Sequence, residues 1–560
     1  MTQKNEHLFS TRLMVLSGIF ASFFIILLLQ LFSLQLYHFE TYNVQAQKNY
    51  LKSLEIKPKR GLIYDRNNKL LAENKETYFV KLGKNDDDIR DFLNIKDPNL
   101  TNYEVDKTDI IKLKSNPAFS NRIEIEEKNI RHYPYGKYAF SVIGYGTILD
   151  NTFQPANGIE KQYNDLLSGR SGYYQYVTDA KGSKTPTSNV INEQNGNDIH
   201  LTIDMDLQKI AYQSLNASKG AVIILNPTNG EVLALVSKPT IDPNDIRNLF
   251  SKPNALGIDQ PLFNRVTSGL FSPGSTIKPF YGLAGLEHKL ITDKTVIEDQ
   301  GYLMLGGHKF HDVNKNGHGY VDLQKAIAVS CDTFFYQLGL KLGIDNMNHI
   351  LTDFGLGKST GIDLPNESIG IVPSKSWKQA VKHQSWYGGD TVITAIGQGS
   401  LLSTPIQLAK ATSILANRGY YYYPHILKST TDFQKQAHNL IFQKNYIEKH
   451  LASNYEIIDR SMRDAMQRGT GYYTFSGSPY AIAGKTGTTQ ITSNIHTREM
   501  GVVPKNLADH SLFIGYAPNK KPELVIVVLV ENYEMSASRV AKQILDYYFN
   551  KRKQDNVITI

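Results

Sequence analysis

The chain has 560 residues, which is longer than one compact domain usually is and predicts two or three folding units. Its 41% hydrophobic, 11% aromatic and 20% charged residues are typical of a folded protein and exclude a wholly disordered chain. A single cysteine excludes an intrachain disulfide and a zinc site built from several thiolates. The net charge of +8 is small for this length, and no Cys/His finger or RNA-binding signature accompanies it, so we expect no nucleic-acid partner.

Near the N-terminus, residues 13–36 form a long apolar stretch without a charged side chain. As a helix this stretch would be about 36 Å long, which is enough to cross a bilayer core of about 30 Å. Lys4 and Arg12 precede it and the next Lys or Arg is Lys48, so the positive-inside rule places residues 1–12 in the cytoplasm and the remainder outside. A cleaved signal peptide and a buried core helix are the alternatives. We favour a single membrane anchor because no Ala-x-Ala cleavage pattern follows.

Downstream of the anchor the chain divides into two parts. In residues 40–205, short apolar stretches alternate with polar turn clusters, which predicts a β-rich, elongated pedestal. In residues 206–550, strands at both ends with helical segments between them predict one α/β unit closed by its termini, and residues 551–560 are predicted to be a solvated tail. The fold class is therefore α+β and multidomain. Within the second part, the clearest predicted elements are a strand hairpin at 221–225 and 232–236, strands at 510–515 and 524–530, and a helix at 538–549.

The first candidate catalytic element is the tetrapeptide Ser275-Thr-Ile-Lys278. A serine hydroxyl is a poor nucleophile at neutral pH and needs a base within reach. Residues i and i+3 share one face of a helix, so the spacing predicts that the Lys278 amine points toward the Ser275 hydroxyl. The preceding Ser272-Pro-Gly274 predicts the turn at which this helix begins. Alone, Ser-x-x-Lys is a weak motif, and an ordinary pair on a surface helix is the alternative.

Two further elements follow in order, Ser330-Cys-Asp332 and Lys485-Thr-Gly-Thr488. The three together form the signature of penicillin-recognising enzymes, in which Ser-x-x-Lys is followed by Ser-x-Asn or Ser-x-Asp and then by Lys-Thr-Gly. The ordered set is far more specific than any one member. It makes Ser275, Lys278, Ser330, Asp332 and Lys485 the candidate catalytic residues.

The residue types fit acyl transfer. Lys278 has to be desolvated or close to another cation in order to be a neutral amine that accepts a proton. Ser330 can relay a proton to the leaving nitrogen. Lys485 places a positive charge beside the substrate carboxylate and near Lys278.

The third motif supplies the substrate-binding candidates. Thr486 and Thr488 can donate hydrogen bonds to the carboxylate. Gly487 allows a substrate backbone to approach the strand edge closely. The backbone N–H groups of Ser275 and Thr488 would form the oxyanion hole.

Nearly the whole chain resembles the class B penicillin-binding proteins, and most of all the elongation-specific subfamily. Beyond the three motifs, the resemblance rests on Arg60-Gly-Leu-Ile-Tyr-Asp-Arg66 with Leu70-Leu-Ala72, Gly158-Ile-Glu160 with Tyr163 and Leu166, residues 220–239, and Gly397-Gln-Gly399 with Thr404-Pro405. It implies that residues 206–550 form a transpeptidase domain with an antiparallel sheet flanked by helices. The enzyme would be a D,D-transpeptidase of the inner membrane, with its catalytic domain in the periplasm, that cross-links peptidoglycan stem peptides during elongation. The D-Ala-D-Ala donor forms an acyl-serine intermediate, and β-lactams acylate the same serine.

The same resemblance implies a structural metal, while no cofactor is expected for catalysis. Asp299, Asp312, His318 and Cys331 are similar to a zinc-binding pattern found in members of the elongation subfamily. Carboxylate, imidazole and thiolate are suitable zinc ligands, and four of them would close a structural site. The alternative is a buried, inert thiol beside a polar loop.

The sequence contains no obvious glycosyltransferase domain, so the resemblance implies partners: a RodA-like SEDS glycosyltransferase and elongation scaffold proteins. Three enzymes are alternatives to the elongation transpeptidase. They are a division-specific class B transpeptidase, a D,D-carboxypeptidase and a serine β-lactamase, of which the last two use water as the acceptor. A β-lactam-sensing receptor and a catalytically dead scaffold are the non-enzyme alternatives.

Overall fold

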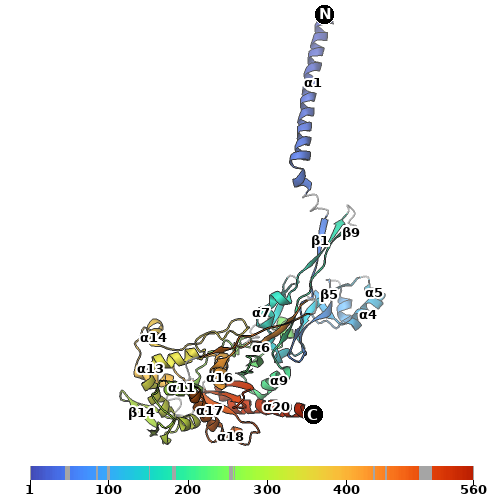
Figure 1. The fold of residues 1–560 in the computed structure, drawn as a ribbon. Coiled ribbons are helices and arrows are strands. Elements are labelled where there is room, and N and C mark those ends of the chain that lie inside the picture. The colour runs from blue at the N-terminus through green and yellow to red at the C-terminus, as the bar shows by residue number, and fades with distance from the viewer. Residues whose placement is uncertain are drawn as a thin grey trace. The chain divides into compact units, whose positions relative to one another are not determined.

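The structure is a computed structural model that describes residues 2–43, 51–83, 86–97, 101–120, 122–149, 152–178, 184–250, 257, 259–432, 436–447, 451–490 and 508–558. Contacts divide the chain into two units. The anchor unit comprises Met1–Lys59 and Gly169–Asn195, and the catalytic unit comprises Arg60–Ser168 and Gly196–Ile560. Each unit is described by itself (Figure 1).

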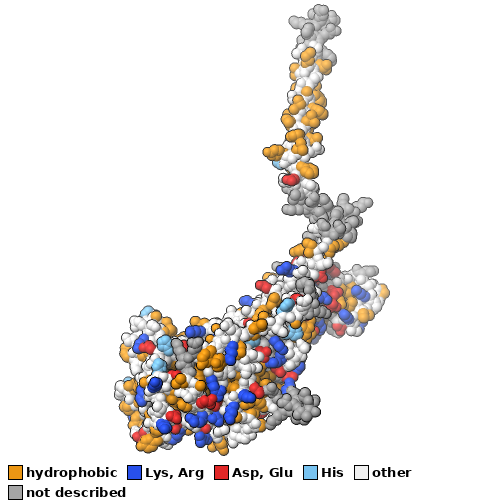
Figure 2. All heavy atoms as spheres, in the orientation of Figure 1, with side chains coloured by type: hydrophobic (Ala, Val, Ile, Leu, Met, Phe, Trp, Pro, Cys, Tyr) orange, Lys and Arg blue, Asp and Glu red, His pale blue; other side chains and the backbone are white. Residues whose placement is uncertain are grey.

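The anchor unit contains the predicted apolar helix. Helix α1 (Thr2–Phe32) continues into a π-helical turn, Ser33–Tyr37, and its large apolar side chains from Leu13 onward are exposed (Figure 2). Within the described residues, Ser10–Tyr37 is the one helical stretch long and apolar enough to cross a membrane. The same unit holds an antiparallel sheet of β1 (Leu51–Ile56), β8 (Gly172–Thr178) and β9 (Lys184–Ile191).

The catalytic unit begins with the pedestal sheet, whose strand order is β19-β18-β10-β2-β3-β4 with β5 paired to β3. Most of its strands come from the predicted pedestal region. Two come instead from residues 427–439, far downstream of the predicted boundary at residue 205, so the late part of the chain returns to complete this sheet. The strands are β2 (Ile63–Tyr64), β3 (Leu70–Lys81), β4 (Asn102–Val105), β5 (Glu124–His132), β10 (Asp198–Leu201), β18 (Leu427–Thr431) and β19 (Ala437–Asn439).

Short elements surround the pedestal sheet, as expected from a sequence without long helical periodicity. They are α3 (Asp87–Phe92), α4 (Lys107–Ser115), α5 (Pro117–Ser120), α6 (Phe140–Ile143), α7 (Gly158–Gln162), α8 (Asn164–Leu167), the 3₁₀ turn Gly136–Tyr138, and the hairpin of β6 (Gly146–Leu149) and β7 (Thr152–Pro155).

A buried ion cluster ties the two pedestal sequence motifs together. The Arg60 Nη2 atom lies 2.7 Å from Glu160 Oε2, and the Arg131 Nε atom lies 2.7 Å from Glu160 Oε1. Glu160 is fully buried, so its charge depends on these two guanidinium groups. Arg60 also donates to the Asn164 side chain at 2.8 Å. We call Arg60, Arg131 and Glu160 the pedestal cluster.

The central sheet of the catalytic unit is antiparallel, with the strand order β12-β11-β23-β22-β21. Its strands are β11 (Gly220–Leu225), β12 (Val232–Lys238), β21 (Ala483–Thr489), β22 (His510–Ala517) and β23 (Leu524–Val530). The predicted hairpin and both late strands are confirmed. Every residue of β23 is buried because helices cover both faces of the sheet.

The alternation of strand side chains sets which helices cover which face. Val222 and Ile224 pack with α9 (Met205–Ser214) and α20 (Ala537–Ile558) in one hydrophobic cluster. Ala221 and Ile223 belong to the main cluster, which includes residues of α11 (Lys278–Glu287), α16 (Pro405–Ala416) and α17 (Ala452–Gln467).

The other elements of the catalytic unit lie between β12 and α20 in the chain. The helices are α10 (Ile246–Phe250), α12 (Leu323–Val329), α13 (Asp332–Asp353), α14 (Lys375–Lys382), α15 (Gly388–Ala395) and α18 (Tyr472–Phe475). The 3₁₀ turns are η3 (Pro243–Asp245), η4 (Gly274–Ile277) and η6 (Glu531–Tyr533). The small strand pairs are β13 (Ile297–Asp299) with β16 (Gly319–Val321), β14 (Tyr302–Leu305) with β15 (His308–His311), and β17 (Tyr420–Tyr421) with β20 (Asn445–Tyr446).

The C-terminus differs from the prediction. Residues 551–560 were expected to form a solvated tail, but α20 continues to Ile558. No Gly or Pro interrupts the helix, and the Lys551 Nζ atom lies 3.1 Å from Asp206 Oδ2, which ties the end of the helix to α9. Residues 559–560 lie outside the described residues.

Candidate active site

Ser275 lies on a tight turn at the start of a buried helix. The 3₁₀ turn η4 (Gly274–Ile277) leads directly into α11, so the predicted helix entry is confirmed. Gly274 has φ of +55°, and its N–H donates to the Gly397 carbonyl at 2.9 Å. A side chain at Gly397 would collide with Gly274, because its Cβ would lie 2.1 Å from the Gly274 oxygen. This close approach of two glycines fixes the turn while Ser275 stays half-buried.

The Lys278 amine joins the first motif to the second. It is fully buried and donates to the Ser330 carbonyl at 2.8 Å, to Ser330 Oγ at 3.2 Å and to Asp332 Oδ1 at 2.6 Å. The Phe335 ring centroid lies 5.5 Å from the amine, a cation–π contact that closes its apolar side. The first and second motifs therefore form one hydrogen-bonded cluster, although Lys278 and Ser330 are 52 positions apart in the chain.

This geometry changes one detail of the prediction from spacing. Among the described residues, no hydrogen bond joins Lys278 to the Ser275 hydroxyl, because the amine is directed at Ser330 and Asp332. Asp332, whose role the sequence left open, is thus the counter-ion of the motif lysine. Lys278, in an ion pair with Asp332, therefore lies between the nucleophile turn and the proton-relay candidate Ser330.

Ser330 itself adopts an unusual backbone conformation. It caps α12 in the left-handed region, with φ of +62° and ψ of +38°, which is rare for a residue with a side chain. The conformation turns the chain from α12 into α13 within two residues, so that the Ser330 carbonyl and hydroxyl both face Lys278. Local strain of this kind is typical of functional sites.

The third motif lies on the edge strand β21, which packs directly against the nucleophile turn. The Thr489 hydroxyl donates to the Ser272 carbonyl at 2.7 Å. A Cβ added to Gly487 would lie 2.8 Å from Thr276 Cγ2 and 3.2 Å from the Pro273 oxygen. The immediate reason for a glycine here is therefore the approach of the nucleophile turn, and not only that of a substrate backbone.

Lys485 is a fully buried cation without a carboxylate partner among the described residues. Its amine donates to the Thr486 carbonyl at 2.9 Å. Burial and the neighbouring charge of Lys278 hold the pKa of Lys485 well below its usual value, although Asp332 acts in the opposite direction. The site thus contains two cations for one carboxylate.

Beside Lys485, the polar side chains of β21 are accessible. Thr488 is exposed, and the half-buried Thr486 donates its hydroxyl proton to Thr470 Oγ1 at 2.7 Å. Within the described residues β21 pairs with a strand on one side only, so its free edge can receive an extended peptide. Thr470 was not predicted, because it lies outside all three motifs.

The four predicted metal ligands also converge. One donor atom from each of Asp299, Asp312, His318 and Cys331 lies within 4.8 Å of the others. The His318 Nδ1 atom is 2.8 Å from Asp299 Oδ2 and 3.5 Å from Asp312 Oδ1, and the Cys331 Sγ atom is 3.4 Å from Asp299 Oδ2. Tetrahedral zinc with bonds of 2.0–2.3 Å would separate its ligands by about 3.3–3.8 Å. The donor set therefore fits such an ion in chemistry, and the separations of 3.4 and 3.5 Å lie in this range, while His318 and Asp299 are closer together than a bound ion would hold them.

This cluster adjoins the catalytic loop. Cys331 lies between Ser330 and Asp332 and caps α13, with its Sγ atom accepting from the Phe334 N–H at 3.4 Å. Asp312 Oδ2 accepts from the Thr333 N–H at 2.9 Å. Burial and the nearby carboxylates raise the pKa of the Cys331 thiol. An anion-rich cluster thus anchors the loop that positions the partners of Lys278.

Comparisons with known proteins agree with this arrangement. The family profile described as "Penicillin binding protein transpeptidase domain" matches residues 220–549, and that of the "Penicillin-binding Protein dimerisation domain" matches residues 55–100 and 93–201. The chain is 34% identical to the peptidoglycan D,D-transpeptidase MrdA of Acinetobacter baumannii, over 99% of this chain and 90% of that protein. It is 32% identical to MrdA of Escherichia coli K12, over 93% of this chain and 91% of that protein.

Solved structures show the same likeness. Penicillin-binding protein 2 (PBP2) of Helicobacter pylori, in a complex with MreC, has a TM-score of 0.76 at 28% identity and covers 89% of this chain and 99% of its own. PBP2 of Pseudomonas aeruginosa, in complex with WCK 5153, has a TM-score of 0.66 at 32% identity, covering 88% and 96%. A chain from "Structural coordination of polymerization and crosslinking by a peptidoglycan synthase complex" has a TM-score of 0.72 at 26% identity, covering 95% and 97%.

Proposed function

The chain belongs to the penicillin-binding transpeptidases, and on that premise we propose that Ser275 is the residue that becomes acylated. The protein is a peptidoglycan D,D-transpeptidase of the elongation type, a serine enzyme acting on D-Ala-D-Ala. The observation that carries the residue assignment is the convergence of three distant motifs. The Lys278 amine contacts Ser330 and Asp332, and β21 packs on the turn that holds Ser275.

The proposed reaction begins with the donor peptide along the free edge of β21. Its terminal carboxylate contacts the Lys485 amine and the hydroxyls of Thr486 and Thr488. Hydrogen bonds to an ionised carboxylate are stronger than those between neutral groups. Binding of this anion offsets the second cation of the site. The backbone N–H groups of Ser275 and Thr488 then stabilise the oxyanion.

Acylation transfers one proton and breaks one amide bond. Ser275 Oγ attacks the carbonyl of the penultimate D-Ala and loses its proton to Lys278 as Lys278 passes one of its own protons to Ser330 and Ser330 passes its hydroxyl proton to the leaving nitrogen, so that Lys278 and Ser330 end the step as they began it. The terminal D-Ala departs as an amine. An amine of a neighbouring stem peptide attacks the acyl ester, and the proton that it loses returns to Ser275.

Covalent labelling by a fluorescent penicillin tests this assignment. Ser275→Ala should abolish labelling while the melting temperature stays within a few degrees, because a half-buried hydroxyl adds little to packing. Ser272→Ala, three residues earlier on the same turn, is the matched control and should label. Labelling that survives in Ser275→Ala would contradict the proposal.

We also propose that the enzyme is anchored by α1 with its N-terminus in the cytoplasm and its catalytic unit in the periplasm. The helix Ser10–Tyr37 and the excess of Lys and Arg before it support this topology. Similar proteins are solved with MreC and in a peptidoglycan synthase complex, which supports a scaffold protein and a RodA-like glycosyltransferase as partners.

A structural zinc ion is the proposed occupant of the cluster of Asp299, Asp312, His318 and Cys331. When bound, it would supply no reactive chemistry, because four protein ligands leave no open position. The residues would hold the ends of the β14–β15 hairpin against the Ser330 loop, since Asp299 precedes that hairpin and Asp312 follows it.

Elemental analysis of the purified full-length protein tests the zinc proposal. We expect about one zinc per chain in the wild type and in His308→Ala, an exposed histidine of β15. The zinc content should fall in His318→Ala and in Cys331→Ser. Equal zinc content in all four proteins, or none in the wild type, would contradict the proposal.

A further inference from the structure

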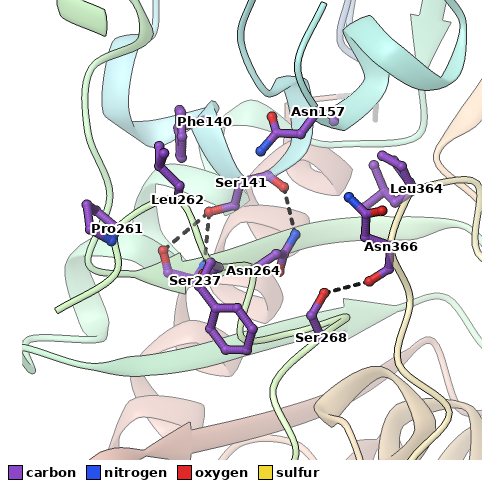
Figure 3. Close-up of a pocket in the computed structure, with 13 residues that line it drawn as sticks. Phe140, Ser141, Asn157, Ser237, Pro261, Leu262, Asn264, Ser268, Leu364 and Asn366 are labelled. Atoms are coloured by element: carbon purple, nitrogen blue, oxygen red, sulfur yellow. Dashed lines mark hydrogen bonds between the residues drawn. The ribbon is translucent and has the colours of Figure 1, made fainter. Parts of the chain in front are cut away.

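A cavity of about 290 Å³ lies in the catalytic unit, and none of the candidate catalytic residues lines it (Figure 3). Its walls come from the pedestal part (residues 140–158), from residues 237 and 261–268, and from residues 364–366. This volume is at the small end of the range for ligand pockets. It suits one sugar-sized group better than a long peptide.

The cavity is free of charge. Its thirteen lining residues include no Asp, Glu, Lys, Arg or His, and its large apolar side chains are those of Phe140, Leu262, Phe263, Leu364 and two prolines. A ligand with a carboxylate would lose its hydration here without gaining an ionic partner. This argues against the peptide termini that the catalytic site receives.

Several polar groups of the cavity already bind one another. Ser141 Oγ donates to the Ser237 carbonyl at 3.3 Å and accepts from the Ser237 N–H at 3.1 Å. Asn264 Nδ2 donates to the Ser141 carbonyl at 3.1 Å, and Ser268 Oγ donates to the Asn366 carbonyl at 2.7 Å. The bonds of Ser141 join the pedestal part to the transpeptidase part, and the bond of Ser268 joins two walls within the transpeptidase part (Figure 3).

Two side-chain amides remain for a ligand. Figure 3 shows the side-chain nitrogens of Asn157 and Asn366 pointing toward the cavity from different walls. Asn157 Oδ1 is buried and has no hydrogen-bond partner in the part of the chain that the structure describes. Asn366 holds its position with φ of +64°. The Asn157 oxygen is an acceptor beside Gly144, so the acceptor oxygens of a ligand would pair instead with the side-chain nitrogens of Asn157 and Asn366, which are donors.

From these features we infer that the cavity binds an uncharged N-acetylated amino sugar of the glycan strand. The acetamide and hydroxyl oxygens would accept from Asn157 and Asn366, and the apolar face of the sugar would pack against Phe140, Leu262 and Leu364. The inference rests on the proposed function, because peptidoglycan is the polymer that joins such sugars to stem peptides.

The chain connects this cavity to the nucleophile. The lining segment 261–268 ends at Ser268, and Ser275 follows seven residues later in the chain. Along the way, the Phe271 N–H donates to the Ser403 carbonyl at 2.9 Å, and the Ser272 carbonyl accepts from Thr489. A bound sugar would therefore be held on the body that carries the acylated serine.

Binding of chitotriose, the β-1,4-linked trimer of N-acetylglucosamine, tests the inference by NMR titration of the full-length protein in detergent. Cellotriose, which lacks the acetamide, is the ligand control. Asn366→Gly removes the amide and keeps the left-handed backbone, and should weaken binding about three- to tenfold. Leu262→Trp fills the cavity and should abolish binding. Asn94→Gly, at another exposed asparagine with positive φ, should bind as the wild type does.

Penicillin labelling of Ser275 is measured on every sample, so the two proposals can fail separately. No chitotriose binding by a protein that labels would overturn this inference and leave the proposed function intact. Equal binding of cellotriose, or unchanged binding in both Asn366→Gly and Leu262→Trp, would also overturn it. Absence of labelling in the wild type would contradict the proposed function.

Discussion

The pedestal cluster and the catalytic cluster, which consists of Lys278, Lys485 and Asp332, have the same charge composition. They differ in that both cations contact the carboxylate in the pedestal cluster but only one does in the catalytic cluster. Each has two cations around one carboxylate. In the pedestal, Arg60 and Arg131 both contact Glu160 at 2.7 Å. In the catalytic site only Lys278 contacts Asp332, while Lys485 donates to a backbone carbonyl.

The difference separates a structural ion cluster from a binding site. Two planar guanidinium groups share one carboxylate well, because each presents several donors in a fixed plane. A lysine is a point charge, and the second one in the catalytic site is left for an external anion. The pedestal cluster is closed by its own residues, whereas the catalytic cluster is closed by substrate.

Removing the shared carboxylate of the pedestal should have the largest effect on stability. Glu160→Gln leaves Arg60 and Arg131 buried without an anion, and we expect the free energy of unfolding to fall by about 3–5 kcal/mol. Glu124→Gln is the control, because its pair with Lys81 is exposed and screened by solvent, so we expect a much smaller change. Thermal unfolding of the full-length variants measures both. Equal effects would contradict the view that the pedestal cluster is closed and structural.

Loosening the contact between β21 and the nucleophile turn should have an intermediate effect. In Gly487→Ala, the new methyl group meets Thr276 and Pro273, so we expect a loss of about 1–3 kcal/mol and slower acylation by penicillin. Gly389→Ala is the control, since the nearest atom to its added Cβ is 3.6 Å away. Acylation of Gly487→Ala at the wild-type rate would show that the catalytic cluster does not depend on this close packing.

The pH dependence of acylation should show the smallest effect. A free lysine has a pKa near 10.4. Because the pKa of Lys485 is lowered, its amine loses its proton at a lower pH than that. Capture of a β-lactam carboxylate should therefore weaken as the pH rises through that lowered value. Lys485→Arg stays charged and should lose this alkaline decline. A wild-type acylation rate that falls only near pH 10.4 would contradict the view that Lys485 is a buried cation without a carboxylate partner.

The sequence predicted those parts of the site that depend on local order. Ser275, Lys278, Ser330 and Lys485 belong to motifs whose residue types are tied to the chemistry, and the structure brings the motifs together. The direction of the Lys278 amine was not predictable, because its partner Asp332 lies 54 positions away and competes with Ser275 for it.

Features that depend on long-range register were missed. Arg131 joins the pedestal cluster because β5 pairs with β3, and nothing in its own segment marks that role. Strands β18 and β19 join the pedestal sheet from residues 427–439, whereas composition alone suggested a boundary near 205. Residues 551–558 are mostly charged and polar, which predicted a tail, but they contain no Gly or Pro and continue helix α20.

The most direct test of the uncompensated cation is Lys485→Met, with the acylation rate and the melting temperature measured on the same sample. Because the pKa of Lys485 is lower in the folded protein than in the unfolded chain, the charged amine opposes folding fully below that lowered pKa, and the cost disappears as the pH rises toward the pKa of a free lysine. We expect acylation by benzylpenicillin to fall about 10- to 100-fold, the value of a hydrogen bond to a charged group, while the melting temperature stays the same or rises. Undiminished acylation, or a marked loss of stability, would contradict the account that Lys485 is held for the substrate.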